Sequence, residues 1–185
     1  QDILGIINET KRRDNIKAVI LEVDSTGGGP TAAEEVANAM KSLEKPTVAL
    51  IREYGTSAAY YAATGADIIF ASQNSDVGGI GVTMSYIDNA KQNQTDGLTY
   101  NSLSLGKYKD YGDPDKVLTG EERQVMMRDV KIYYDNFVRA VAENRKLDIN
   151  KVRQLADGAS MPGQLALDNG LIDRLGSFDE VREYL

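Results

Sequence analysis

Two nearly continuous apolar runs, residues 17–23 and residues 47–51, are separated by a glycine-rich turn and an amphipathic stretch. Such runs are typical of strands that are buried on both faces of a parallel sheet. The stretch between them keeps one helical face apolar, and Thr31 with Glu34 forms a capping-box pattern at its start. Strand, helix and strand in this order form a right-handed crossover unit, which predicts an α/β fold with a mostly parallel sheet flanked by helices.

The rest of the chain continues this alternation. Helices are predicted at residues 2–13, 60–64, 149–156, 164–167 and 178–185, and a long one begins at the capping box of Thr119 and Glu122. Further strands are predicted at residues 67–71, 82–86, 98–105 and 171–173, whereas residues 106–114 are rich in turn formers. We expect residues 1–185 to form a single catalytic domain, because this length supports one well-buried core.

The chain contains neither histidine nor cysteine. A Ser-His-Asp triad, a histidine-ligated metal, a disulfide and a cysteine nucleophile are therefore excluded. We expect no metal and no cofactor, and any general base must be Lys, Asp, Glu, Tyr or the amino terminus. The net charge of −7 argues against a nucleic-acid partner.

Ser57 stands at a predicted strand-to-helix junction, because residues 46–51 are strand-like and the residues after it are small and compatible with a helix. At such a junction a hydroxyl can project into a cleft, while the first N–H groups of the helix face developing negative charge. The alternative is structural, since small residues at strand ends commonly just permit close packing. The junction alone therefore leaves the role of Ser57 open.

The glycine turn at residues 26–29 allows three interpretations: a flexible connection, a phosphate-binding loop or a backbone oxyanion hole. The spacings of the phosphate loop and of the dinucleotide-binding turn are both absent. An oxyanion hole remains possible, because glycine lets a carbonyl oxygen approach the main chain closely. A serine nucleophile would then need a neutral lysine as its base, and Lys107 and Lys109 stand in the turn-rich loop, which could equally be a solvated turn.

Five blocks in order resemble the signal peptide peptidase A (protease IV) family of the Clp-protease/crotonase superfamily. The turn Asp-Ser-Thr-Gly-Gly-Gly at residues 24–29 is similar to the family's Asn/Asp-Ser-Pro-Gly-Gly turn, and residues 57–63 resemble its nucleophile block. Residues 78–82 match its Gly-Ser-Ile-Gly-Val crossing, residues 106–110 its lysine loop, and residues 156–176 its closing signature. The resemblance covers nearly the whole chain.

The resemblance implies a Clp-protease/crotonase-like fold built of repeated β-β-α and βαβ units. It also implies a serine endopeptidase of the Ser/Lys dyad type, degrading remnant signal peptides or other apolar membrane-associated peptides. Ser57 would be the nucleophile, and Lys109 the general base, because the family's base directly precedes the Asp or Ser of that loop. The N–H groups of Gly27 and Ala58 would form the oxyanion hole. Substrate contacts are expected at Gly28 and Gly79.

The resemblance further implies a ring-like homo-oligomer and a catalytic domain anchored to a membrane on its extracytoplasmic side. Because the sequence opens at Gln1 rather than at Met, inside a predicted helix, we expect the N-terminal anchor to be absent from the chain shown.

Two departures from the family pattern are present. The family's Gly-Gly after the nucleophile is Ala58-Ala59 here, and the serine that helps to hold the lysine is replaced by Gly79. Ser75, Thr83 or a water could substitute for that hydroxyl. Two other functions therefore remain: a catalytically weakened scaffold, which Gly79 favours, and a crotonase-like acyl-CoA enzyme with the same fold and oxyanion turn.

A lysine base predicts a particular pH dependence. Because the amine must be neutral to accept a proton, peptidase activity should rise from about pH 6 to an alkaline plateau. Initial rates of peptide cleavage across this range would measure it. A flat profile would contradict lysine as the base.

Overall fold

The computed structural model describes residues 2–185, and Gln1 lies outside them. These residues form two compact units: the first comprises residues 2–81 and 134–185, and the second comprises residues 82–133. The expectation of a single domain stays a prediction.

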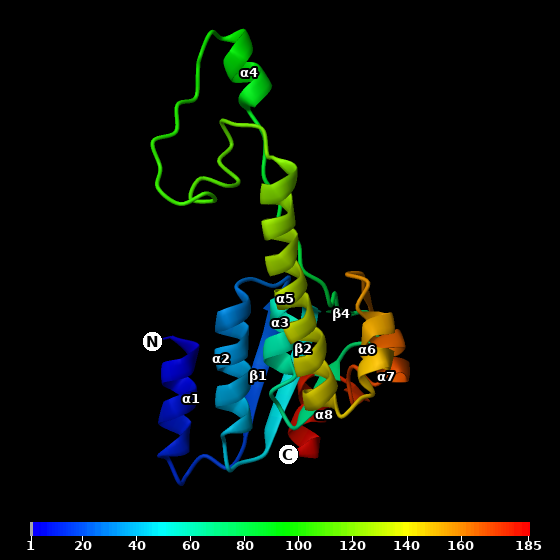
Figure 1. Ribbon diagram of the computed structural model, residues 1–185. Coiled ribbons are helices and arrows are strands. Elements are labelled where there is room, and N and C mark those ends of the chain that lie inside the picture. The colour runs from blue at the N-terminus through cyan, green and yellow to red at the C-terminus, as the bar shows by residue number, and fades with distance from the viewer. Residues whose placement is uncertain (1) are drawn as a thin grey trace. The chain divides into compact units, whose positions relative to one another are not determined.

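The first unit is built on a six-stranded sheet (Figure 1). Its strands are β1 Val19–Ser25, β2 Thr47–Thr56, β3 Ile68–Ala71, β4 Asp76–Gly78, β5 Ser160–Pro162 and β6 Arg174–Leu175. The central strand β2 pairs in parallel with β1, with β3 through its first half, and with β4 through its last three residues. β3 pairs in parallel with β6, and only the β4–β5 pair is antiparallel among the pairings of the described residues. The sheet is therefore mostly parallel, as predicted.

Helices cover both faces of this sheet. The helices of the first unit are α1 Ile3–Lys11, α2 Pro30–Lys41, α3 Ala58–Ala63, α6 Ile149–Leu155, α7 Gly163–Asn169, α8 Phe178–Tyr184 and the end of α5 Gly120–Arg145. Figure 1 shows α1 beside α2, and α2 also packs against α3. The main core joins the helices other than α8 to the side chains of Ile51, Ile69 and Val77. A smaller core, in which Val181 of α8 packs on Leu50, covers the opposite face.

The second unit contains α4 Ala90–Thr95 and the first half of α5, and its other residues form turns and irregular segments. The start of α5 is fixed by the predicted capping box. The Glu122 carboxylate accepts the Thr119 N–H at 2.9 Å, and the Glu122 N–H donates to the Thr119 hydroxyl at 3.3 Å. Across residues 2–185, every helix is too short or too polar to cross a lipid bilayer.

Most elements predicted from periodicity are confirmed, although their ends shift by one or more residues. Strands 17–23, 47–51 and 67–71 correspond to β1, β2 and β3, and the helices predicted at both ends of the chain correspond to α1 and α8. The helix predicted before Gly170 is α7, and Gly170 closes it in the left-handed conformation with φ 81°. The mixed α/β class is therefore confirmed, and the arrangement is consistent with the expected Clp-protease/crotonase-like fold.

Several local predictions are wrong. The capping box at Thr31 does not form: α2 begins at Pro30, whose fixed φ suits the first helical position, and its N-cap is Gly29. Residues 82–86 and 98–105 form no strands: they belong to the second unit, whose residues 82–133 contain no strand with which they could pair. No strand forms at the predicted residues 171–173; β6 begins directly after them, and the short strands β4 and β5 were not predicted.

One partly buried ion pair joins the end of α5 to the residue that precedes β6. The Arg145 guanidinium donates to both carboxylate oxygens of Asp173, at 2.9 and 2.7 Å, and to the Gly170 carbonyl at 3.2 Å. Asp173 also accepts the N–H of Ile69 at 2.7 Å. Only 7% of the Arg145 side chain is exposed. The Arg145 guanidinium and the Asp173 carboxylate are thus each held by more than one hydrogen bond.

Removal of this guanidinium should destabilise the first unit. Arg145→Met leaves Asp173 without its bidentate partner and should lower the free energy of unfolding by about 2–4 kcal/mol. The matched control is Arg52→Met, which breaks the half-exposed Arg52–Glu22 pair and should change it by about 0.5 kcal/mol or less. Urea denaturation measures both, and equal effects would contradict this role for Arg145.

Candidate active site

The candidate nucleophile lies where three parallel strands end. β1 ends at Ser25, β2 ends at Thr56 and β4 ends at Gly78. β2 pairs in parallel with both of the others, with Ser25 opposite Gly55 and Gly78 opposite Thr56. The segments that follow these strands therefore emerge at the same edge of the sheet, the edge at which parallel α/β sheets bind ligands.

Ser57 occupies a strained backbone conformation at this edge. It directly follows β2, begins α3 as its N-cap, and has φ 53° and ψ −129°. A non-glycine residue with these angles is unfavourable by about 1–3 kcal/mol, and such strain clusters at functional sites. A serine on a sharp strand-to-helix turn is also how α/β hydrolases present their nucleophile. The Ser57 N–H holds the turn in place by donating to the Gly78 carbonyl at 2.7 Å.

The glycine turn after β1 lies directly against Ser57. A Cβ added at Gly27 would stand 2.9 Å from the Ser57 Cβ and 3.2 Å from its Oγ, and Gly27 has φ 131°. Only glycine permits this approach, so the turn requires glycine at this position. The Thr56 hydroxyl fastens the two segments together by donating to the Thr26 carbonyl at 3.1 Å.

Two backbone N–H groups belong to residues adjoining Ser57, one to the next residue in the chain and one to the glycine turn packed against it. The first is the N–H of Ala58, which opens α3 ahead of the helix's first internal bond, from Tyr61 N–H to the Ser57 carbonyl. The second is the N–H of Gly27, whose bond to the Ser25 hydroxyl is long, at 3.3 Å. A bond of this length is weak, so a developing oxyanion would compete for the donor. The assignment of both as the oxyanion hole stays a prediction.

The two glycines predicted to contact substrate differ in their surroundings. A Cβ added at Gly28 would meet no atom within 4 Å, so open space adjoins this residue. Gly79 has φ 60°, and a Cβ there would lie 3.3 Å from the Ser57 nitrogen. The backbone itself thus favours glycine at the position where the family usually has serine. The contacts of both glycines with substrate remain predictions.

The neighbouring hydroxyls have structural partners. The Ser75 hydroxyl donates to the carbonyl of Arg52 and accepts the N–H of Ser72 at 3.0 Å, which makes it a poor substitute for the missing serine. The Tyr60 hydroxyl donates to the Leu171 carbonyl at 2.7 Å, and burial raises the pKa of Tyr60. Tyr60 is therefore a core residue and not a base.

The candidate base lies in the second unit, in the turn-rich loop. Lys107 is held by the Glu121 carboxylate at 2.6 Å, and this hydrogen bond raises the pKa of Lys107. Lys116 is held by Glu122, whose hydrogen bond likewise raises the pKa of Lys116. Lys109 is exposed, and its side chain makes no ion pair or hydrogen bond with the rest of residues 2–185. Of these three lysines, Lys109 is the one without a carboxylate partner among residues 2–185.

The structure thus brings Ser57, Gly27, Ala58 and Gly79 together in the first unit and places Lys109 in the second. Sequence reasoning assigned Glu122 to helix capping and gave Lys116 no role. No local signal could have found Lys116, because its carboxylate partners, Asp110 and Glu122, each stand six residues away and only the fold of the loop brings them to it.

A mostly parallel α/β sheet with a serine on a strained turn beside a glycine turn defines the class of serine hydrolases. Comparison with known families narrows this class. The model of Peptidase family S49 matches residues 39–185, and the chain belongs to this family. Its membership confirms the resemblance to the signal peptide peptidase A and protease IV group and places the chain among serine peptidases.

Three relatives illustrate the similarity. "Putative protease" of Methanocaldococcus jannaschii is 33% identical over 184 residues, covering 98% of this chain and 59% of that protein. "Putative signal peptide peptidase SppA" of Enterococcus faecium is 33% identical over 188 residues, covering 100% of this chain and 55% of that protein. "Protease 4" of Salmonella typhi is 28% identical over 179 residues, covering 94% of this chain and 28% of that protein. The chain thus spans little more than half the length of the first two.

Strain at Ser57 predicts an unusual order of stabilities. Ser57→Gly should be more stable than Ser57→Ala by about 1 kcal/mol, because glycine adopts a positive φ without steric conflict. Ser42, which ends α2 with φ −82°, is the matched control. There the alanine variant should be the more stable one, by about 0.5–1 kcal/mol. Thermal unfolding of the four variants measures this, and the same order at both positions would refute strain at Ser57.

Proposed function

We propose that this chain is the catalytic part of a serine endopeptidase of the Ser/Lys dyad type, with Ser57 as nucleophile and Lys109 as general base. The observation that carries the proposal is the conformation of Ser57, a strained serine at a helix start against the Gly27 turn. Family membership supports peptide-bond hydrolysis, and the absence of histidine leaves lysine as a suitable base.

The proposed mechanism has two halves. Neutral Lys109 accepts the Ser57 proton as Oγ attacks the peptide carbonyl, and the N–H groups of Gly27 and Ala58 stabilise the oxyanion. Protonated Lys109 then gives its proton to the leaving amine, and an acyl-enzyme forms at Ser57. In the second half, Lys109 takes a proton from water, which attacks the ester and forms a second oxyanion. Lys109 then returns this proton to the Ser57 oxygen as the ester C–O bond breaks, which releases the acid product and restores the free serine.

The proposed substrates are remnant signal peptides or other apolar, membrane-associated peptides in extended conformation. Their backbone would pass the open space beside Gly28 and approach Gly79. The name of the Enterococcus faecium relative supports this substrate class. A ring-like homo-oligomer and anchoring of the whole protein to a membrane, with the catalytic part on the extracytoplasmic side, belong to the same proposal.

Mass spectrometry of an apolar signal-like peptide after incubation with the chain tests the dyad. Ser57→Ala and Lys109→Ala should each lower the cleavage rate at least about 100-fold, because they remove the nucleophile and the base. The matched control is Lys107→Ala, which removes a neighbouring lysine already held protonated by Glu121 and should change the rate by less than about threefold.

Native mass spectrometry and circular dichroism would confirm that the variants keep the fold and assembly of the wild type. Equal loss in Lys107→Ala and Lys109→Ala would contradict Lys109 as the base. A folded wild-type chain without any cleavage would favour the weakened scaffold instead.

A further inference from the structure

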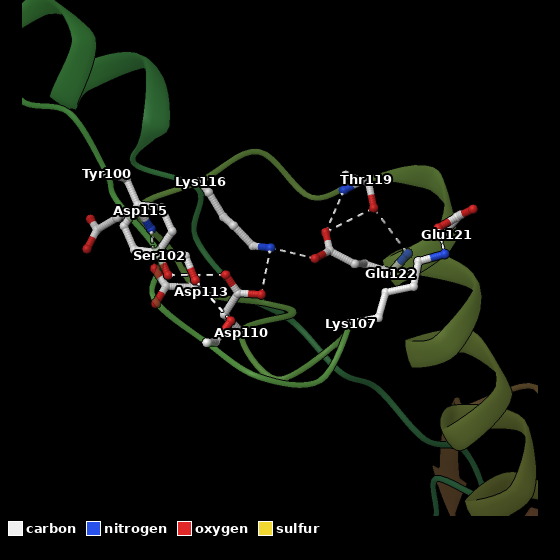
Figure 2. Close-up of polar contacts among 11 residues, drawn as sticks. Tyr100, Ser102, Lys107, Asp110, Asp113, Asp115, Lys116, Thr119, Glu121 and Glu122 are labelled. Carbon is white, nitrogen blue, oxygen red and sulfur yellow. Dashed lines mark hydrogen bonds and ion pairs between the residues drawn. The ribbon is translucent and has the colours of Figure 1, made fainter.

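The loop that carries Lys109 is tied to the start of α5 by a compact ionic cluster (Figure 2). The Lys116 amine lies 2.5 Å from Glu122 Oε1 and 3.2 Å from Asp110 Oδ1. All three side chains are largely shielded, with 21% of Lys116, 6% of Glu122 and 19% of Asp110 exposed. Shielded pairs are screened less by salt and water than surface pairs, so this contact constrains the loop.

The Glu122 carboxylate is also held in place by contacts that do not involve Lys116. Its second oxygen, Oε2, accepts the N–H of Thr119 at 2.9 Å and the Thr119 hydroxyl at 3.0 Å. Hydrogen bonds from Lys116 and then from Thr119 lower the pKa of Glu122, so its carboxylate stays charged. The first turn of α5 therefore holds the Glu122 carboxylate in a defined position. Because Lys116 binds this carboxylate, the loop that contains Lys116 is held in position on α5.

At its other end the cluster reaches the residue next to the candidate base. Asp110 directly follows Lys109 in the chain. Its Oδ1 accepts from Lys116 and its Oδ2 from the Tyr100 hydroxyl, at 3.4 Å. Hydrogen bonds from Ser102 and from Lys116 lower the pKa of Asp110, so it too stays charged. The carboxylate nearest to Lys109 in the chain is therefore engaged with other partners.

This engagement matters because a free carboxylate beside a lysine favours the protonated amine. We propose that Lys116 is a positioning residue for Lys109: it fixes the loop on α5 and keeps the Asp110 carboxylate from pairing with the Lys109 amine. The inference rests on the proposed role of Lys109 as base. Lys116 does not itself touch substrate in this proposal.

The other charged groups around the loop have partners of their own, so the pairing with Asp110 falls to Lys116. Lys107 is paired with Glu121, and its amine also lies 5.2 Å from the ring centre of Tyr108. Asp113 is near Tyr100, and the Asp113 carboxylate accepts the N–H of Asp115 at 2.9 Å within the turn. Among residues 82–133, Lys116 is the only cation paired with Asp110.

The Lys107–Glu121 pair supplies a matched control. Like Lys116–Glu122, it joins the loop to the first turn of α5 through a contact of similar length, 2.6 Å. Its two side chains are each 64% exposed, and neither is ion-paired or hydrogen-bonded to Asp110, whose partners include Lys116 and Tyr100. Loss of this pair removes one loop lysine and leaves the Asp110 carboxylate as it was.

Amine labelling followed by peptide mass spectrometry tests the inference without relying on peptidase activity. The rate at which acetic anhydride modifies Lys109 in the 185-residue chain would be measured between about pH 7 and pH 11, because only the neutral amine reacts. Lys116→Met should move the labelling profile of Lys109 to higher pH and lower its rate at pH 8 at least about threefold. Lys116→Arg, which keeps the charge, should stay within about twofold of wild type.

Two further variants separate the electrostatic role from a structural one. Adding Asp110→Asn to Lys116→Met should restore the wild-type profile, because the freed carboxylate is gone. Lys107→Met should leave the profile unchanged. Asp110→Asn alone should also change it little; a move to lower pH in this variant would show that Asp110 already pairs with Lys109, and it would overturn the proposal even if Lys116→Met failed to fold.

The same variants in the peptide-cleavage assay distinguish the two proposals. A shifted labelling profile in a chain that cleaves no peptide would refute the proposed function and leave the positioning role of Lys116 intact. An unshifted labelling profile in folded Lys116→Met would refute the positioning role, whatever the cleavage rate. If both hold, the acid limb of kcat/KM should move with the labelling profile.

Discussion

Parallel pairing of β2 with β1 and with β4 is the constraint on which the candidate site depends. Because all three strands run in the same direction, their ends deliver the Gly27 turn, Ser57 and Gly79 to one edge of the sheet. The buried side chains of β2 hold this arrangement on both faces, through Ile51 on one and Leu50 on the other. The position of Ser57, the candidate nucleophile, is therefore a property of the whole core and not of a flexible loop.

The close approach at this edge explains the composition of the site. Ser57 has a strained backbone conformation. Hydrogen bonds from Ser57 to Gly78 and from Thr56 to Thr26 hold it in this conformation. Strain of this kind persists only where neighbouring structure over-determines it. The same close packing requires glycine in the neighbouring turn, because a side chain at Gly27 would collide with Ser57. Glycine at position 79 follows from its positive φ, so it does not by itself indicate lost activity.

The second unit is organised by charge and not by an extended apolar core. Lys107 and Lys116 each meet a carboxylate of the first turn of α5, where negative charge also suits the helix dipole. The two pairs differ in exposure. The Lys107–Glu121 pair is a solvated surface contact, whereas the shielded Lys116–Glu122 pair constrains the loop. Lys109 lies between these two lysines in the chain and is left without an anionic partner among residues 2–185.

The sequence by itself determined the elements whose signal is local: the apolar runs of β1, β2 and β3, the capping box at Thr119, the left-handed Gly170, and the chemistry that the absence of histidine forbids. It also indicated Ser57 and the glycine turn, because residue type and order at a strand end are visible in one dimension. Tertiary structure decided what depends on partners. Residues 98–105 alternate like a strand, yet they find no neighbour, and Leu103 and Leu105 are almost fully exposed. Likewise, only the folded chain shows which lysine each carboxylate binds, because ion pairing depends on distance in space and not on spacing in the sequence.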